Sequence, residues 1–213
     1  MKFYGFYRSS AAHRCRIAFN LKGVQPEFVA VHLRKGEQRA EPFIGLNPQG
    51  LVPALEVDGR VLTQSLAIIE WLDETHPAPP LLPRDRFDRA HVRALAFSIA
   101  ADIHPLQNLR VLRAMKRDYG QDQAGLDAWC RRWVEPGLAA FEAMVVKTGQ
   151  AGAFCFGDTP TLADICLVPQ MVSARRFGVS TAKLEALTLI ETACAGHPAF
   201  AQADPSLQPD TQT

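Results

Sequence analysis

The stretch Tyr7-Arg8-Ser9-Ser10-Ala11-Ala12-His13-Arg14-Cys15-Arg16-Ile17-Ala18 places two small hydroxyl residues where an apolar strand turns into a helix. We expect the strand over residues 2–7 and the helix over 11–22, with Gly23 closing the helix. A serine just before the first helical residue caps free backbone N–H groups. That end of a helix is also its positive pole and can hold an anion such as a thiolate. The stretch alone fits either an ordinary cap or an anion site.

The cysteines indicate that such a thiolate would come from a small molecule. A thiol with an ordinary pKa of about 8.5 is mostly protonated at neutral pH, so it gains from a positive helix end. Cys15 lies a turn inside the predicted helix rather than at its start. The cysteines form no C-x-x-C pair and are odd in number, which predicts reduced thiols, no disulfide framework, no metal site and a cytoplasmic protein. They are Cys15, Cys130, Cys155, Cys166 and Cys194.

The composition predicts a globular protein without a strongly charged partner. The 213 residues suffice for one large domain or two small ones. A net charge of +1 gives no reason to expect nucleic acid or a membrane surface as a partner. No apolar run approaches the length of a membrane span, and we expect no secretory signal before the first strand.

The first part of the chain alternates between strand and helix patterns. Strands are predicted over residues 2–7, 27–32, 53–57 and 60–63. Asp58-Gly59 predicts a tight hairpin, and Ser65 is expected to cap a helix over 66–74. This order predicts an α/β domain over residues 1–80, with a small mixed sheet and helices on its faces. The proline-rich segment 76–83 is typical of a linker.

Beyond this linker, every periodic segment predicts a helix. We expect an all-helical domain over residues 86–203 and a loose polar tail over 204–213. Thr161 and Asp164 have the spacing of a capping box, for which a structural role outweighs a catalytic one. The helices are predicted over residues 86–116, 122–146, 161–177 and 183–194.

Two further places in the first domain are suited to a ligand. Pro53 has no N–H for a ladder, so the backbone of Val52 is available to a ligand, most directly if their peptide bond is cis. A proline that merely starts a strand fits the same residues. Gln64 and Ser65 stand at a second helix start, which would suit a carboxylate unless Ser65 is an ordinary cap. With Ser9-Ser10 they predict a cradle for a small peptide that has a thiol and a carboxylate.

The helical half contributes polar and basic side chains. Pro105 is expected to kink its helix, while His104 and Asn108 would share a face at positions i and i+4. Arg110 follows within the next turn. Arg176 stands near the end of another helix, where a basic residue often only complements the helix dipole.

These residues resemble the zeta-class glutathione transferase family, and within it the maleylpyruvate and maleylacetoacetate isomerase branch. The similarity in spacing extends from Met1 to about Phe200. The segments that show it are Ser9-Ser10, Arg14-x-Arg16-Ile17-Ala18, Leu46-Asn47-Pro48, Val52-Pro53-Ala54-Leu55, Gln64-Ser65-Leu66-Ala67-Ile68-Ile69-Glu70, Pro105-Leu106-Gln107-Asn108-Leu109, Gly157-Asp158-x-x-Thr161-Leu162-Ala163-Asp164 and Cys166-Leu167-Val168-Pro169-Gln170.

The resemblance implies a glutathione transferase fold: a thioredoxin-like N-terminal domain and an all-helical C-terminal domain, paired as a homodimer. It implies glutathione as the cofactor, with Ser9 and Ser10 facing the sulfur. Val52 would pair with the cysteinyl backbone across a cis Pro53, and Gln64-Ser65 would bind the γ-glutamyl carboxylate. The other cofactor-binding residues that it implies are Gln49, Asp102, His104 and Asn108.

The activity that the resemblance implies is glutathione-dependent cis–trans isomerisation of a maleyl keto acid, maleylpyruvate or maleylacetoacetate, in aromatic-compound catabolism. The thiolate adds to the cis double bond, the bond rotates, and expulsion of the thiolate leaves the trans isomer. Arg8, Arg110 and Arg176 are expected to bind the carboxylates of the substrate, because guanidinium and carboxylate form bidentate pairs. Relatives usually read Ser-Ser-Cys-Ser, whereas Ala11 and Ala12 stand here, so no protein thiol is expected beside the glutathione sulfur.

Two other functions fit the same residues. A broader glutathione transferase or dehalogenase would use the same thiolate on small electrophilic acids. An interaction protein with this fold would bind its partner without turnover.

Overall fold

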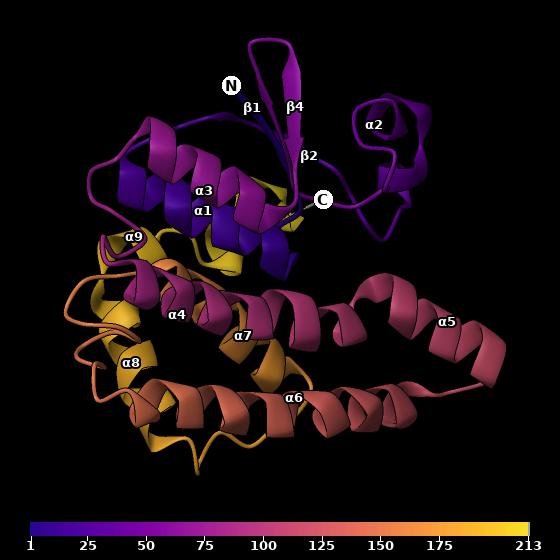
Figure 1. Ribbon diagram of the computed structural model, residues 1–213. Helices are drawn as coiled ribbons and strands as arrows, with labels where there is room; N and C mark the ends of the chain where they lie inside the picture. The colour runs from indigo at the N-terminus through magenta and orange to yellow at the C-terminus, as the bar shows by residue number, and fades with distance from the viewer. Residues whose placement is uncertain (213) are drawn as a thin grey trace. The chain divides into compact units, whose positions relative to one another are not determined.

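The computed structural model describes residues 1–212, which form two compact units. The first unit contains Met1–Pro80 and the residues from Gly196 onward, and the second is Leu81–Ala195. Figure 1 shows the elements of both units. No helix within residues 1–212 has the length and apolar character needed to cross a membrane.

A four-stranded sheet in the order β2-β1-β3-β4 forms the centre of the first unit. The strands are β1 (Lys2–Gly5), β2 (Glu27–Ala30), β3 (Ala54–Val57) and β4 (Arg60–Thr63). β1 pairs in parallel with β2 and antiparallel with β3, and β3 pairs antiparallel with β4. Asp58 and Gly59 have φ of 49° and 74°, as a tight turn between β3 and β4 requires. The predicted mixed sheet and its hairpin are confirmed, with strands up to two residues shorter than expected.

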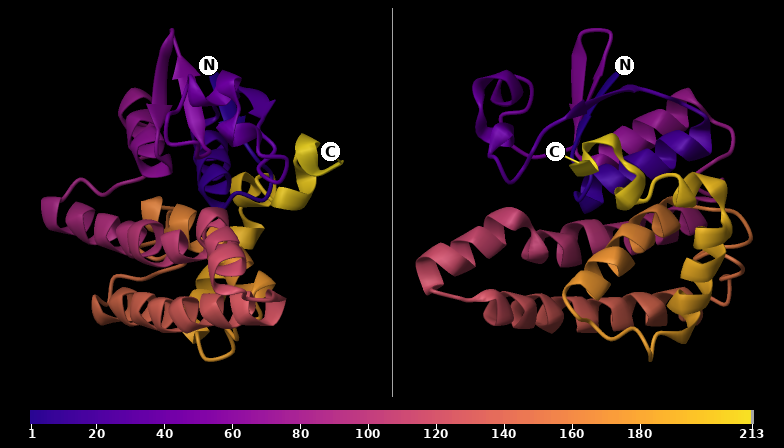
Figure 2. Two further views of the ribbon diagram at one scale, coloured as in Figure 1. Left: turned by 90° about the vertical axis from the view of Figure 1, so that its right-hand side faces the viewer. Right: turned by 180° about the vertical axis from the view of Figure 1, so that it is seen from behind.

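Helices cover both faces of this sheet. They are α1 (Ser10–Lys22), α2 (Glu41–Ile44) and α3 (Ser65–Thr75). In Figures 1 and 2, α1 and α3 lie side by side on one face and α2 lies on the other. Ile17 of α1 and Ile69 of α3 are buried in the core between the helices and the sheet. At the other end of α1, Lys22 Nζ donates to Asp73 Oδ1 at 2.6 Å and also to the Pro79 carbonyl oxygen, which ties α1, α3 and the linker together.

The C-terminal residues belong to the first unit, in contrast to the predicted boundaries. The sequence pattern assigned residues 86–203 to the helical domain and 204–213 to a loose tail. Instead, the chain from Gly196 folds back along α1, and the backbone N–H of Tyr7 donates to Asp210 Oδ2 at 2.8 Å. The elements of this segment are α9 (Pro198–Ala201) and the 3₁₀ turns η4 (Pro205–Leu207) and η5 (Pro209–Gln212).

The polar composition of this tail predicted a loose segment, but its polar side chains order it by binding backbone groups. Asp204 Oδ1 accepts from the Ser206 N–H at 2.8 Å, and Gln208 Nε2 donates to the Asp204 carbonyl oxygen at 2.9 Å. Such local bonds satisfy the backbone of a short turn without a regular helix or strand.

The second unit is built of helices. They are α4 (Arg86–Phe97), the π-helical turn η2 (Ser98–Ile103), the 3₁₀ turn η3 (His104–Gln107), α5 (Leu109–Tyr119), α6 (Gln123–Lys147), α7 (Leu162–Arg176) and α8 (Glu185–Gly196). α4, α6 and α7 pack against one another, whereas α5 extends away from them and buries none of its residues (Figures 1 and 2). The single helix predicted over 86–116 is wrong in its middle, because Pro105 has no N–H to continue the ladder and Asn108 starts a new helix.

The start of α7 is fixed by a fully buried carboxylate. Asp164 Oδ2 accepts from the Thr161 N–H and hydroxyl, both at 2.8 Å, and its Oδ1 accepts from the Cys155 N–H at 2.7 Å. Burial raises the pKa of Asp164, and these donated hydrogen bonds oppose that shift. The predicted capping box is therefore present, and Asp164 also holds the loop that precedes α7.

We expect Asp164→Ala to lower the free energy of unfolding by about 3 kcal/mol, because three buried donors lose their acceptor. Urea denaturation measures this loss. Asp122→Ala is the matched control, since Asp122 caps α6 at the surface by accepting from the Gly125 N–H at 2.8 Å. That variant should lose only about 1 kcal/mol. Equal losses in the two variants would contradict the structural role of Asp164.

Candidate functional site

Ser9 caps the start of α1. Its backbone is extended, with φ −73° and ψ 116°, and its Oγ accepts from the Ala12 N–H at 3.2 Å. The hydroxyl proton of Ser9 is not used in that bond, so the side chain can still donate to a ligand. Ser10, the first residue of the helix, is only 9% exposed. The helix start is therefore both an ordinary cap and a place where an anion can bind, with Ser9 the more accessible hydroxyl.

The start of α3 differs from its prediction. Ser65 is the first helical residue rather than the cap, and Gln64 takes the cap position with φ 68° and ψ 120°. The Gln64 side chain makes no capping hydrogen bond. The first-turn N–H groups of α3 are therefore not satisfied by their own cap residue and can donate to a ligand. A positive φ at a residue other than glycine is uncommon and is typical of functional sites.

A buried guanidinium lies beside the start of α3. Arg14, on α1, is 2% exposed, and its Nη1 donates to Ser65 Oγ at 3.3 Å. Its Nε and Nη2 atoms are also buried and have no hydrogen-bond partner within residues 1–212. A buried cation with unused donors beside the start of a helix has the chemistry to bind an anion. The sequence pattern gave Arg14 no binding role, although Arg14 belongs to the segment Arg14-x-Arg16-Ile17-Ala18 that resembles the family.

The turn before β3 brings two more predicted residues to this site. The Val52-Pro53 peptide is cis, as the resemblance implied. Gln64 Nε2 donates to Gln49 Oε1 at 2.9 Å, so these two amides lie next to each other. Asn47, which is buried, shapes the turn because its Oδ1 accepts from the Gln49 N–H at 3.1 Å.

Within residues 1–212, neither of these helix starts has an exposed thiol or a strongly basic imidazole. All five cysteines are buried and none forms a disulfide within residues 1–212, and the Cys15 Sγ lies 3.9 Å from the carbonyl oxygen of Ser65. Burial, with the nearby charge of Arg16, lowers the pKa of His13 to about 3, so this imidazole is neutral at physiological pH. A thiolate at the α1 start would therefore come with a ligand.

The remaining cofactor-binding candidates lie in the second unit. Asp102 is exposed on η2, and His104 is half-buried in η3. Asn108 is extended, with φ −66° and ψ 145°, and caps α5 by accepting from the Arg110 N–H at 3.1 Å. The shared helical face predicted for His104 and Asn108 is wrong, because the helix is interrupted between them.

Side chains of α6 and α7 hold this interrupted segment. Trp129 Nε1 donates to the Leu106 carbonyl oxygen at 2.8 Å, and Gln107 Nε2 donates to Gln170 Oε1 at 2.6 Å. Gly137 lets α6 approach closely, since a Cβ there would lie 2.6 Å from Ile103. The segment that contains Asp102 and His104 is therefore well supported.

The three arginines predicted to bind substrate belong to both units. Arg8 is half-buried between β1 and Ser9, and Arg110 is exposed at the start of α5. Arg176 is exposed, with its guanidinium 5.9 Å from the ring centre of Phe177. The adjacent Arg175 forms an ion pair with Glu191 at 2.7 Å, so it has a structural partner.

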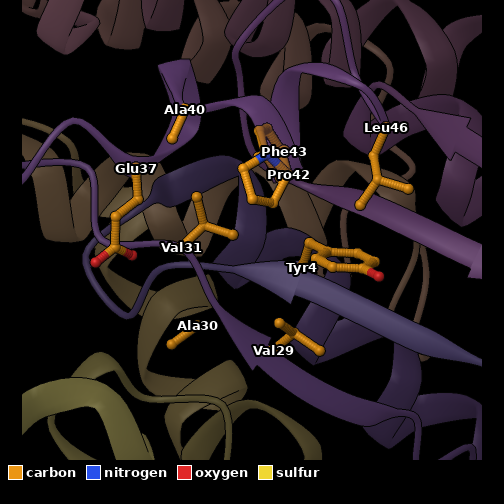
Figure 3. A pocket seen from close by; sticks show the side chains of 9 residues that line it. All are labelled: Tyr4, Val29, Ala30, Val31, Glu37, Ala40, Pro42, Phe43 and Leu46. Carbon is orange, nitrogen blue, oxygen red and sulfur yellow. The ribbon is translucent and has the colours of Figure 1, made fainter.

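A cavity of about 390 Å³ lies elsewhere in the first unit (Figure 3). It is formed by strands β1 and β2 and by α2, with Tyr4, Val31 and Phe43 among its mainly apolar lining. None of the predicted site residues lines it. The polar helix starts, rather than this cavity, are the candidate site.

Residues 8–75 match the family described as "Glutathione S-transferase, N-terminal domain". Over 211 residues the chain is 49% identical to the maleylpyruvate isomerase of a Ralstonia species, covering 99% of this chain and 100% of that protein. It is also similar to the holo structure of a maleylpyruvate isomerase, described as a bacterial zeta-class glutathione S-transferase. That similarity has a TM-score of 0.97 and 49% identity, and covers 99% of each chain.

A second solved structure has ligands. It is the maleylacetoacetate isomerase of Methylobacterium extorquens with bound malonate and glutathione, similar with a TM-score of 0.94 and 40% identity over 98% of each chain. Identity at this level over the full length establishes common family membership and not only a common fold. This chain belongs to the zeta-class glutathione S-transferases, in the family of the maleylpyruvate and maleylacetoacetate isomerases.

Proposed function

We propose that this protein is a glutathione-dependent cis–trans isomerase of a maleyl keto acid, either maleylpyruvate or maleylacetoacetate. The observation that supports the cofactor most directly is the uncapped start of α3 beside the buried Arg14 guanidinium. That pair of features suits a carboxylate, and the start of α1 suits a thiolate. Glutathione has both groups, and the Methylobacterium relative is described with glutathione bound.

The residues of the first unit fit glutathione along its length. Ser65 and the first-turn N–H groups of α3 would bind the γ-glutamyl carboxylate, with Arg14 neutralising its charge. The backbone of Val52, before the cis Pro53, would pair with the cysteinyl residue. Gln49 would line the glycine end, where we also assign Asp102, His104 and Asn108. Gln64 directly precedes Ser65, and its Nε2 donates to Gln49 Oε1 at 2.9 Å. Gln64 would therefore connect the residues at the γ-glutamyl end to those at the glycine end.

The protein stabilises charge in this reaction. When bound, glutathione supplies a thiolate that adds reversibly to the cis double bond, which then rotates as a single bond and re-forms trans. Ser9 would donate its hydroxyl to the sulfur, and the α1 dipole would favour the thiolate over the thiol. Arg8, Arg110 and Arg176 would bind the carboxylates and the charge that develops on the substrate's ketone oxygen. Malonate, bound in the Methylobacterium relative, is likewise a dicarboxylate.

Two alternatives have specific discriminating tests. A broader transferase or dehalogenase would act on small electrophilic acids faster than on either maleyl keto acid. A non-catalytic interaction protein would not need accessible donors at both helix starts. Retention on glutathione-agarose without turnover would favour the interaction protein.

We propose that this protein is a homodimer, as the family resemblance implies, which sedimentation equilibrium would test. We also propose a cytoplasmic location, because five cysteines that form no disulfide within residues 1–212 suit a reducing compartment.

A side-by-side assay tests the proposed activity. We expect isomerisation of maleylpyruvate, maleylacetoacetate or both, at a rate that depends on glutathione although glutathione is not consumed. S-Methylglutathione, which has no thiol, is the matched control and should support no turnover. Isomerisation at the same rate without glutathione would contradict the proposal, as would a faster reaction with haloacids.

Ser9→Ala should raise the pKa of the bound glutathione thiol by about one unit, because the sulfur loses a hydrogen-bond donor. The thiolate absorbance of the complex, titrated with pH, measures this. Ser10→Ala is the matched control and should shift the pKa less, since Ser10 is nearly buried. Ser9→Ala also removes a cap, so it should be compared at a temperature where both variants are folded. An unchanged thiol pKa in both variants and in their combination would exclude a role for either hydroxyl.

Arg8→Ala and Arg176→Ala should each lower kcat/KM by about thirtyfold, equivalent to the loss of about 2 kcal/mol for a carboxylate contact. Steady-state kinetics at saturating glutathione measures this loss. Arg175→Ala is the matched control for Arg176, because Arg175 is paired with Glu191. The assignment fails if Arg175→Ala loses as much activity as Arg176→Ala, or if both predicted variants keep wild-type activity.

A further inference from the structure

The C-terminal segment contacts the chain immediately before the site serine. Asp210 is 4% exposed, and its Oδ2 accepts from the Tyr7 N–H at 2.8 Å, across 203 residues of sequence. This bond lies within the first unit, which contains both residues. Tyr7 is followed by Arg8 and Ser9, so the bond is two residues from Ser9, the proposed hydrogen-bond donor to the glutathione sulfur.

A second buried residue binds the other backbone polar group of Tyr7, its carbonyl oxygen. Arg16 is 7% exposed, and its Nη2 donates to the Tyr7 carbonyl oxygen at 3.1 Å. Its Nε donates to the Ala203 carbonyl oxygen at 3.2 Å, so the same guanidinium holds the start of the tail. Both backbone polar groups of Tyr7 are therefore fixed by the tail or by the side chain that anchors the tail.

Charge makes this arrangement interdependent. Burial lowers the pKa of Arg16 to about 10, while the carboxylates of Asp210 and Asp204 oppose that shift. The guanidinium therefore remains charged at neutral pH, and a buried cation requires a nearby anion. Asp210 thus meets two needs, as acceptor for Tyr7 and as counter-charge for Arg16.

The turn that begins at Tyr7 leads directly into the site. The Ser9 N–H donates to the Phe6 carbonyl oxygen at 3.0 Å, which closes the turn, and the Ser9 hydroxyl caps α1. A shift of the Tyr7 peptide would move Arg8 and Ser9 together. Positions within a catalytic site tolerate little displacement, of the order of 1 Å.

We propose that Asp210 is a positioning residue for the site, and that the C-terminal segment completes the turn that presents Arg8 and Ser9. The effect of Asp210 on catalysis rests on the proposed function, whereas its effect on the Tyr7 backbone does not. Asp210 acts through the Tyr7 peptide and through Arg16 and is not assigned any contact with substrate.

Hydrogen–deuterium exchange of the ligand-free protein tests the structural part. In Asp210→Ala, the Tyr7 amide should exchange about tenfold faster, as expected for the loss of one buried hydrogen bond. Amides at the start of α3 should keep their wild-type rates. Thr211→Val is the matched control, because it removes a bond from the Thr211 hydroxyl to the Gln208 carbonyl oxygen at 2.9 Å and leaves Asp210 in place.

Binding and kinetics test the consequence for the site. Asp210→Ala should raise the pKa of the bound thiol and lower kcat by about tenfold, while the Kd for glutathione changes by less than about threefold because the α3 start is untouched. Asp210→Asn retains an oxygen acceptor for Tyr7 but not the charge, so it should recover slow exchange and part of kcat. If Asp210→Ala does not fold, Asp210→Asn can be compared with the wild-type protein in the same measurements.

The outcomes separate this inference from the proposed function. Wild-type exchange at Tyr7 in Asp210→Ala would overturn the inference, as would equal acceleration across the whole first unit. Faster exchange at Tyr7 with an unchanged thiol pKa and kcat would overturn the positioning role. If the wild-type protein binds no glutathione and isomerises neither substrate, the proposed function fails while the exchange result still stands.

Discussion

The hydrogen bond from the Arg14 guanidinium to Ser65 connects the two helices on which the site depends. It joins α1 to the first residue of α3, so the positive ends of both helices lie at one edge of the sheet. A fully buried cation is costly unless an anion or a set of acceptors is close by. Within residues 1–212, Ser65 Oγ accepts from one nitrogen of this guanidinium and the other two nitrogens have no hydrogen-bond partner. The proposed γ-glutamyl carboxylate would supply the acceptors and the negative charge that these nitrogens lack.

The fold of the first unit could largely be predicted because its signals are local. Asp58-Gly59 specifies a tight turn through backbone preference alone, and Gly23 ends α1 with φ 65°. The strands were predicted slightly too long. In β1 the last paired residue is Gly5, but the apolar pattern continues with Phe6. The interruption near Pro105 was foreseen as a kink, but the change to π-helical and 3₁₀ turns depends on Trp129 and Gln107, whose partners are remote in sequence.

The site was predictable only in part, because some of its residues take their roles from partners that are remote in sequence. Serines, glutamines and a proline at element boundaries are visible in the sequence, and the resemblance assigned each of them a role. The cap of α3 was misassigned because Gln64 adopts a positive φ, which no local preference of glutamine favours. The roles of Arg14 and Asp210 could not be predicted, because they arise from burial and from contacts with residues 51 and 203 positions away. A sequence pattern shows that a residue is polar, and only the packing shows which polar residues are buried.

The two Arg14 nitrogens that have no hydrogen-bond partner within residues 1–212 also connect the stability of this protein to the supply of its cofactor. A carboxylate bound beside them would provide acceptors, and a ligand that binds only the folded state stabilises that state by RT ln(1 + [L]/Kd). At a concentration one hundred times Kd this amounts to about 2.7 kcal/mol, a substantial fraction of the stability of a typical domain. Depletion of glutathione under oxidative stress would then stop the reaction and also shorten the lifetime of the folded protein.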